Sequence, residues 1–103
     1  MDKVIAAKHK KEEAIQMTLG ASAVALTAPT DNRAPDNILV QAHPSNSGII
    51  TIAFEITPAN GGAGYALPAG ANISLGSIDW TKYKAIATAA SQKLNITYQY
   101  GAE

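Results

Sequence analysis

The side chains that could carry chemistry in this sequence are few and scattered. His9 and His43 are its two histidines, and neither belongs to a motif with metal-ligand spacing. Pro44-Ser45-Asn46 follows His43, so we expect a turn in which the imidazole makes a local hydrogen bond. Cysteine is absent, which excludes disulfides, thiolate metal sites and cysteine nucleophiles. These observations predict neither a metal site nor a cofactor.

The carboxylates, serines and glycines do not form a catalytic pattern. Asp31 and Asp36 are the one close carboxylate pair in the body of the chain, and the surrounding polar segment predicts solvated surface groups. No serine lies in a G-x-S-x-G motif. The run 60–64 is glycine-rich but lacks the Lys-Ser/Thr of a phosphate-binding loop, so it predicts a mobile surface loop. We therefore expect a protein that is not an enzyme.

The aromatic residues offer a second kind of chemistry. Trp80, Tyr83, Tyr98 and Tyr100 could form a platform for sugars or bases, which leaves a carbohydrate-binding module as an alternative function. Tyr98 and Tyr100 lie two residues apart, a spacing that favours the edge of a β core. Trp80 lies in a connector and is the better candidate for an anchor in a protein contact.

Alternating apolar residues identify the elements that must hold these groups. Ile50, Ile52, Phe54 and Ile56 share one face of an extended chain, with Thr51 and Glu55 on the other. With the apolar run 38–42 and the turn sequence 43–48, this strand predicts a central β-hairpin. A second hairpin is predicted from the runs 15–19 and 24–27, which flank Gly20-Ala21-Ser22.

The remaining segments complete an all-β pattern. A flexible loop is expected at 58–64, followed by strands near 65–67, 71–75, 82–90 and 94–100, although the alanines of 82–90 also permit a helix. About seven short strands at this spacing predict one antiparallel β-sandwich or jelly-roll-like domain over residues 14–103. Its core is expected to contain Ile, Leu and Val side chains together with Phe54.

Residues 1–13 are expected to form a separate N-terminal arm. They hold seven of the sixteen charged residues, and the positions of Val4, Ile5 and Lys8 are compatible with a short helix. So short a helix is marginal in water unless it has a partner. The residues that we expect to bind a partner come from this arm, from the loop and from the connector: Val4, Ile5, Lys8, Lys10, Lys11, Asn60, Trp80 and Tyr83.

Charge limits the classes of partner. The formal net charge of the 103 residues is zero, which argues against nucleic-acid binding and against attachment to a membrane surface. No apolar run approaches the length of a membrane span, and the charged N-terminus does not resemble a secretory signal, so synthesis in a cytoplasm is expected. Between residues 37 and 81 only Glu55 and Asp79 are charged. A body this neutral is expected where much of the surface faces other subunits, although a neutral soluble domain is an equal alternative.

Residues 14–101 also resemble a known group of proteins. The segments that carry the resemblance are ILVQAHPSNSGII, YALPAGANISLG and AASQKLNITYQY, which follow the strand ending in AVALTAP. Together they resemble small structural proteins of tailed-bacteriophage virions, and the N-terminal arm lies outside the match. The resemblance implies a decoration or cement protein of the capsid, with the major capsid protein or other virion proteins as partners. It also implies a homo-oligomer, for instance a trimer, located in the virion. A tail, neck or baseplate protein is the alternative within this class.

Overall fold

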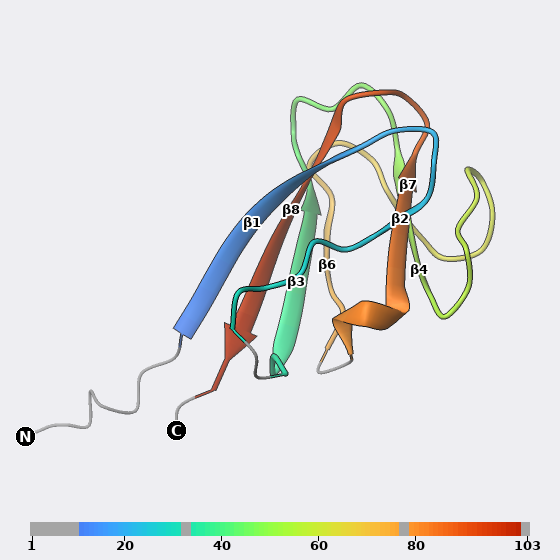
Figure 1. Ribbon diagram of the computed structural model, residues 1–103. Helices are drawn as coiled ribbons and strands as arrows, with labels where there is room; N and C mark the ends of the chain where they lie inside the picture. The colour runs from blue at the N-terminus through green and yellow to red at the C-terminus, as the bar shows by residue number, and fades with distance from the viewer. Residues whose placement is uncertain (1–10, 32–33, 77–78, 102–103) are drawn as a thin grey trace, which may run out of the picture.

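The computed structural model describes residues 11–31, 34–76 and 79–101. Eight strands form two four-stranded antiparallel sheets, which we call sheet A and sheet B (Figure 1). Sheet A has the order β1-β8-β3-β6 and sheet B the order β2-β7-β4-β5. This is the arrangement of an eight-stranded jelly roll, which confirms the all-β sandwich prediction. The strands are β1 (Lys11–Leu19), β2 (Val24–Ala25), β3 (Asn37–Ala42), β4 (Ile50–Phe54), β5 (Tyr65–Leu67), β6 (Asn72–Ser74), β7 (Tyr83–Ala87) and β8 (Gln92–Tyr100).

The core lies between the two sheets and is built by the period-two alternation of the strands. In β8 every second side chain, from Gln92 to Tyr100, is buried, and those between are half-exposed. Ile38 and Val40 of sheet A and Ile50 and Ile52 of sheet B are at most 1 % exposed. Three tyrosines, Tyr83, Tyr98 and Tyr100, join these aliphatic residues. The expected aliphatic core is therefore present, and its large aromatic members are tyrosines.

Phe54 is not the core residue that the alternation predicts. It is 36 % exposed at the end of β4, where its ring centroid lies 5.1 Å from that of Tyr83. The strand ends there because Glu55 adopts a positive φ of 62°. Ile56, which was expected on the same face, is 51 % exposed. The alternation of apolar residues in β4 therefore predicts which side chains face the core only as far as Ile52.

Both predicted hairpins are wrong. β3 lies in sheet A and β4 in sheet B, so the connection 43–49 crosses from one sheet to the other. The same holds for β1 and β2. Because the two strands on either side of each connection lie in different sheets, they bury their apolar faces in the same core from opposite sides. Asn46 holds the 43–49 connection in place, since its side chain donates to the Lys93 carbonyl and accepts from the Lys93 N–H, each at 2.9 Å.

The predicted domain boundary also differs from the structure. The arm was expected to reach residue 13, whereas β1 begins at Lys11 and pairs with β8 without interruption from Lys11 opposite Tyr100 to Leu19 opposite Gln92. Residues 11–13 are therefore strand residues. The expected short helix falls on residues outside the described part of the chain. The segment 82–90, for which a helix was the alternative, contains strand β7 and the last residue of the short 3-10 helix η2 (Trp80–Lys82).

The loop 55–64 packs against the outer face of sheet B. Thr51, Ala53 and Ile86 are buried although they point away from the core. Asn60 Nδ2 donates to the Ala87 carbonyl at 3.2 Å, and Pro58 in the same loop is buried. The loop predicted to be flexible therefore covers one side of the sandwich, as its position beside β4 and β7 shows (Figure 1).

Candidate functional site

The side of the sandwich that no described segment covers is the outer face of sheet A. Each of its four strands directs every second side chain outward, and most of these side chains end in an amide or a hydroxyl. We call this surface the amide face. Its amide and hydroxyl residues are Gln16, Thr18, Asn37, Gln41, Asn72, Ser74, Asn95, Thr97 and Gln99, and its other members are Glu12, Ala14, Leu39 and Lys93.

Side-chain hydrogen bonds connect the amide face from one edge to the other. Gln99 Nε2 donates to Glu12 at 2.7 Å, and Asn37 Nδ2 donates to Gln99 Oε1 at 2.9 Å. Ser74 Oγ then donates to Asn37 Oδ1 at 2.7 Å, so that one row crosses all four strands. A second row begins with Gln16, whose Nε2 donates to Asn95 Oδ1 at 2.9 Å. These bonds orient the side chains, which lowers the entropy that a partner would have to remove on binding.

The centre of the amide face is hollowed. A shallow depression of about 270 Å³ is lined by Leu39, Val40, Gln41, Asn72, Asn95 and Thr97. Leu39 is 36 % exposed and supplies an apolar contact between the amides of its neighbours. The arrangement can therefore receive a side chain that has both an apolar and a hydrogen-bonding part.

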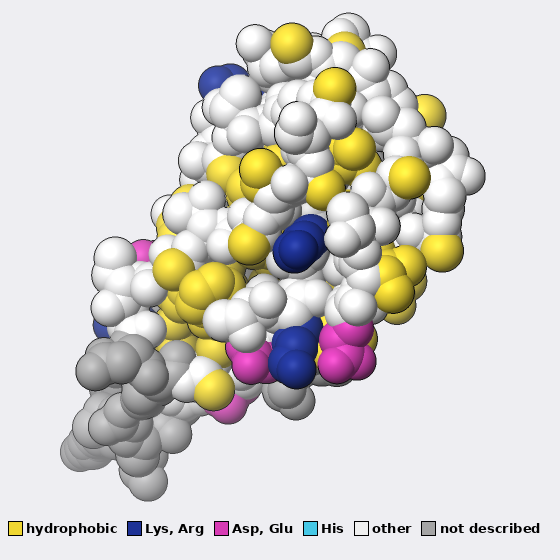
Figure 2. All heavy atoms as spheres, turned by 45° about the vertical axis from the view of Figure 1, so that its right-hand side comes forward, with side chains coloured by type: hydrophobic (Ala, Val, Ile, Leu, Met, Phe, Trp, Pro, Cys, Tyr) yellow, Lys and Arg dark blue, Asp and Glu magenta, His cyan; other side chains and the backbone are white. Residues whose placement is uncertain are grey.

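Among the described residues of sheet A, the charged side chains of the amide face lie at two of its margins. Glu12 ends the first row, and Lys93 Nζ donates to Thr18 Oγ1 at 2.9 Å near the other end of β1. Uncharged polar groups cost much less to bury than charged ones, provided that they find hydrogen-bond partners. The molecule seen from the side of sheet B is also largely uncharged, with charged side chains gathered mainly toward its lower end (Figure 2). Depletion of charge at the centre is typical of a protein–protein interface.

The residues that the sequence singled out lie elsewhere. Val4, Ile5, Lys8 and Lys10 fall outside the described residues. Lys11 lies in β1, where its Nζ is 2.8 Å from Asp31 Oδ2 and 5.8 Å from the centre of the Tyr100 ring. Asn60 uses its amide to fix the loop 55–64 on sheet B. The described members of the predicted set therefore do not form one site.

The predicted aromatic platform does not form. Tyr83 is 4 % exposed, and Tyr98 and Tyr100 are 0 % and 2 % exposed, so these rings cannot stack on a ligand. Naming Tyr83 as a contact residue was therefore wrong, because the residue packs into the core. Trp80 is half-buried against the core in η2. Asp79 caps this short helix by accepting from the Thr81 N–H at 2.9 Å, and it also accepts from the Thr81 hydroxyl at 2.7 Å. The bond from the hydroxyl, and after it the bond from the N–H, holds the pKa of the Asp79 carboxyl below its ordinary value.

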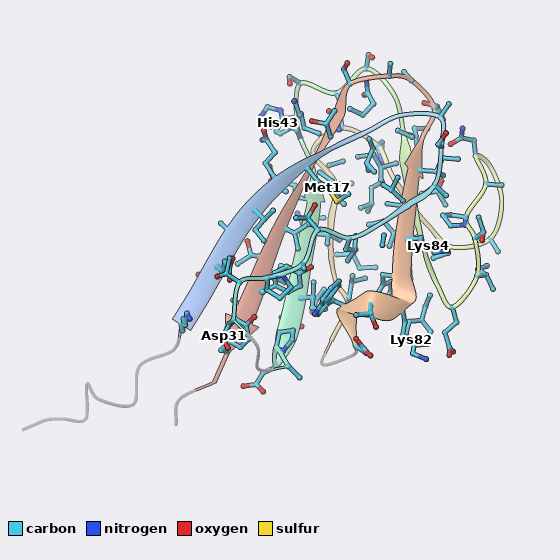
Figure 3. All side chains as sticks on the ribbon, in the orientation of Figure 1. Met17, Asp31, His43, Lys82 and Lys84 are labelled. Atoms are coloured by element: carbon cyan, nitrogen blue, oxygen red, sulfur yellow. The ribbon has the colours of Figure 1, made fainter. Side chains whose placement is uncertain are left out.

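The remaining chemical candidates are separated from one another. His43 lies in a turn as expected, with its Nδ1 accepting from the Ser45 N–H at 3.0 Å. His43 and Asp31 occupy opposite ends of the sandwich (Figure 3). Asp36 accepts from the Gly101 N–H at the end of β8. Within the described residues, no three histidines or carboxylates lie close enough to hold a metal ion.

The sequence contains the signal of the amide face in the polar residues that alternate with the apolar ones of each strand. Asn95, Thr97 and Gln99 alternate with buried residues in β8, and Asn37 and Gln41 do so in β3. The alternation does not show which strands pair when they are far apart in the sequence. It therefore cannot predict that β1, β8, β3 and β6 lie side by side.

Comparisons with known proteins bear on the fold. No family model matches the sequence, and no curated protein matches it significantly. A solved chain from Bacillus endospore appendages, described as a novel family of disulfide-linked pili, is similar in structure, with a TM-score of 0.53 and 19 % sequence identity. The similarity covers 92 % of this chain and 88 % of that chain. At this identity it supports the β-sandwich fold alone. Among the described residues, no helix is long and apolar enough to cross a membrane.

Proposed function

We propose that this chain is a structural protein of a tailed-bacteriophage virion, which decorates or cements the head shell through protein–protein contacts. The observation that carries the proposal is the amide face. It is broad and almost free of charge, and hydrogen bonds among its own side chains hold it in place. Such a surface suits a permanent contact with other protein surfaces, with the major capsid protein as the partner.

The size of the amide face explains why an arm is useful. Four strands spaced about 4.8 Å apart and up to nine residues long cover roughly 20 by 30 Å. This area of about 600 Å² is smaller than the roughly 800 Å² per partner of a typical stable interface. The N-terminal arm, which precedes Lys11 at the margin of the same sheet, would supply the rest by extending onto an adjacent subunit. Its ordering there has an entropic cost that these contacts offset.

A tail, neck or baseplate protein is the second candidate within the same class, and the structural neighbour offers only an analogy for it. That protein belongs to a group described as pili, which are filaments of repeated subunits. A jelly-roll subunit in a tail, neck or baseplate would be arranged in a comparable way. The disulfide linkage of those pili does not carry over, because this chain has no cysteine. Repeated copies would have to be joined by non-covalent contacts.

A substitution at the centre of the amide face tests the proposal. Leu39→Arg places a charge beside Thr97 and Ser74, at a position exposed enough for the sandwich to tolerate it. We expect the variant to keep its circular dichroism spectrum and its melting temperature. Its binding to heads of the encoding phage, assembled without this protein and measured by co-sedimentation, should fall at least about tenfold, since burying an unpaired charge costs several kcal/mol.

Ile49→Arg is the matched control. Ile49 is 43 % exposed and lies in the connection 43–49 rather than on the amide face, so this variant should bind like the unmodified protein. Binding of Leu39→Arg equal to that of the control would contradict a role for the amide face. Absence of the unmodified chain from purified virions, shown by mass spectrometry and cryo-electron microscopy, would contradict the virion assignment. The same maps would distinguish a head position from a tail position.

A further inference from the structure

The outer edge of β1 is a long strand edge that charged residues protect only at its start, at Lys11, Glu12 and Glu13. β1 has nine residues, whereas the strands at the other edges, β2, β5 and β6, have two or three. Its register with β8 continues without a bulge and it contains no proline, although both are common protections of an exposed edge. β1 is the outermost strand of sheet A (Figure 1), and no described residue pairs with its outer edge.

The register shows which backbone groups of β1 face outward. The His43 N–H donates to the Lys93 carbonyl, so Lys93 and every second residue of β8 direct their backbone groups toward β3. The alternate residues of β8 direct theirs toward β1, where they meet the odd-numbered residues. The N–H and C=O groups of the even-numbered residues therefore point outward and lack a strand partner. These residues are Glu12, Ala14, Gln16 and Thr18.

We propose that a second copy of this chain pairs with this edge, β1 antiparallel to β1, about a two-fold axis at Ile15. In this register Glu12 lies opposite Thr18 of the second copy, and Ala14 opposite its Gln16. All four outward-facing residues of each copy are then hydrogen-bonded at once. A shift by two residues in either direction leaves an end residue of the set unpaired. The two sheets A become one continuous eight-stranded sheet.

Charge complementarity favours the same register. Thr18 holds Lys93 Nζ at 2.9 Å, so Glu12 of one copy arrives beside Lys93 of the other, twice by symmetry. Within one chain these two groups are separated by about six strand positions, or about 20 Å. No like charges lie opposite one another in β1, because Lys11 faces Leu19 and Glu13 faces Met17.

The dimer adds an assembly step to the proposed function. Only its biological role, and not its existence, rests on that function. It would be a building block whose two amide faces continue into each other, which about doubles the area available to a partner. The two-fold axis requires the same surface on both copies, as in most soluble homodimers. Its test uses the isolated protein, so the dimer and the virion assignment can fail independently.

A cysteine introduced at the axis tests the register. The two copies of Ile15 form a non-hydrogen-bonded pair, whose Cα separation of about 4.5 Å suits a disulfide. The chain has no cysteine of its own, so Ile15→Cys can be cross-linked only between copies. We expect a covalent dimer after mild oxidation. Thr18→Cys is the control, because the two copies of residue 18 would lie about 20 Å apart and should remain uncross-linked under the same conditions.

Exchanging the charges of Glu12 and Lys93 tests the contact between these residues of the two copies and leaves the core unchanged. Glu12→Lys and Lys93→Glu should each weaken the dimer about tenfold in sedimentation equilibrium, and the double variant should return close to the original affinity. A double variant no better than the single variants, or equal cross-linking at residues 15 and 18, would overturn the proposed register. An unmodified protein that stays monomeric at about 100 μM, where a contact of micromolar affinity is saturated, would overturn the dimer itself.

Discussion

Tyr98 is a fully buried side chain, and its hydroxyl holds the segment after β2 against the inner side of β8. Its ring is 0 % exposed, and its hydroxyl donates to the Thr27 carbonyl at 2.7 Å. Thr27 follows β2, and a little further along Thr30 donates its N–H to Glu13 at 3.0 Å. These contacts attach the segment after β2 to the inner face of sheet A. Alternation in the sequence predicts that Tyr98 belongs to the core edge but says nothing of its partner.

Tyr98→Phe should lower the free energy of unfolding by about 1 kcal/mol, because the hydrogen bond from the Tyr98 hydroxyl to the Thr27 carbonyl is lost. The measurement is urea denaturation, in which the midpoint should fall and the slope should remain unchanged. Tyr83→Phe is the matched control. The Tyr83 hydroxyl lies 3.5 Å from the Leu75 carbonyl, so its removal should cost clearly less. Equal losses for the two variants would contradict the importance of the Thr27 contact.

The same side chain makes stability depend on alkaline pH. Burial raises the pKa of Tyr98 far above its ordinary value of 10.0, and the neighbouring Tyr100 and Glu13 raise it further. Above about pH 10 the unfolded chain releases this proton and the folded chain keeps it, so stability is complete below that pH and falls as pH rises. Urea unfolding between about pH 8 and pH 11 should show this decline, and Tyr98→Phe should show a shallower one. A stability that is constant over this range would contradict the expectation.

At the scale of elements, the connections distinguish this fold from the one that the sequence predicts. Turn residues such as Pro44, Asn46 and Gly48 identify where the chain reverses, but the same residues serve a hairpin and a crossing between sheets. Only the positions of the residues that bond to the connection distinguish a hairpin from a crossing between sheets. The Gly48 N–H donates to Gln92 Oε1 at 2.8 Å, a residue more than forty positions away. Strand positions were thus predictable from alternation, whereas strand pairing was not.

The loop 55–64 depends on one glycine. Gly64 has a φ of 127°, and a Cβ at this position would lie 2.5 Å from the Ile52 carbonyl oxygen. Gly64→Ala should therefore cost about 2–3 kcal/mol of stability and loosen the cover over sheet B. Thermal unfolding by circular dichroism would measure the loss. Gly61→Ala is the control, since Gly61 has a φ of 76° with nothing within 4 Å, so only the left-handed backbone should cost stability, at about 1 kcal/mol.

For the whole molecule, the start of β1 at Lys11 separates two deletions of the N-terminus. Deletion of residues 2–10 keeps every described contact of the sandwich, so it should lower the melting temperature less than a deletion that removes part of β1. Deletion of residues 2–13 should lower it, since it removes the Lys11–Asp31 ion pair and the bonds of Glu13 to Thr30. Thermal unfolding of both variants measures this difference.

Co-sedimentation with phage heads measures the second role of the arm. The 2–10 deletion should bind more weakly than the complete chain if the arm extends onto an adjacent subunit. Unchanged occupancy on the heads would contradict that role and would leave the amide face as the contact.

The amide face illustrates what a single sequence can and cannot show at this scale. The polar residues of β8 and β3 are visible in the alternation, and so is the low charge between residues 37 and 81. Their combination into one surface requires β8 to lie between β1 and β3, and Asn95 to lie opposite both Gln16 and Gln41. The predicted contact residues were selected by type, as aromatic, basic or loop residues. The structure places Lys11, Asn60 and Tyr83 in intramolecular contacts.

The place of β8 has a consequence for biosynthesis. The last of the eight described strands in chain order is a central strand of sheet A, and β1 has no other strand partner within the described chain. At about 5–20 residues per second, the ribosome needs roughly 4–16 s to proceed from the first residues of β1 to those of β8. During this interval the nascent N-terminal strand is available to neighbouring polypeptides on the same messenger RNA. Completion of the sandwich therefore waits until β8 has been synthesised, and the order of synthesis itself favours early encounters between sister chains.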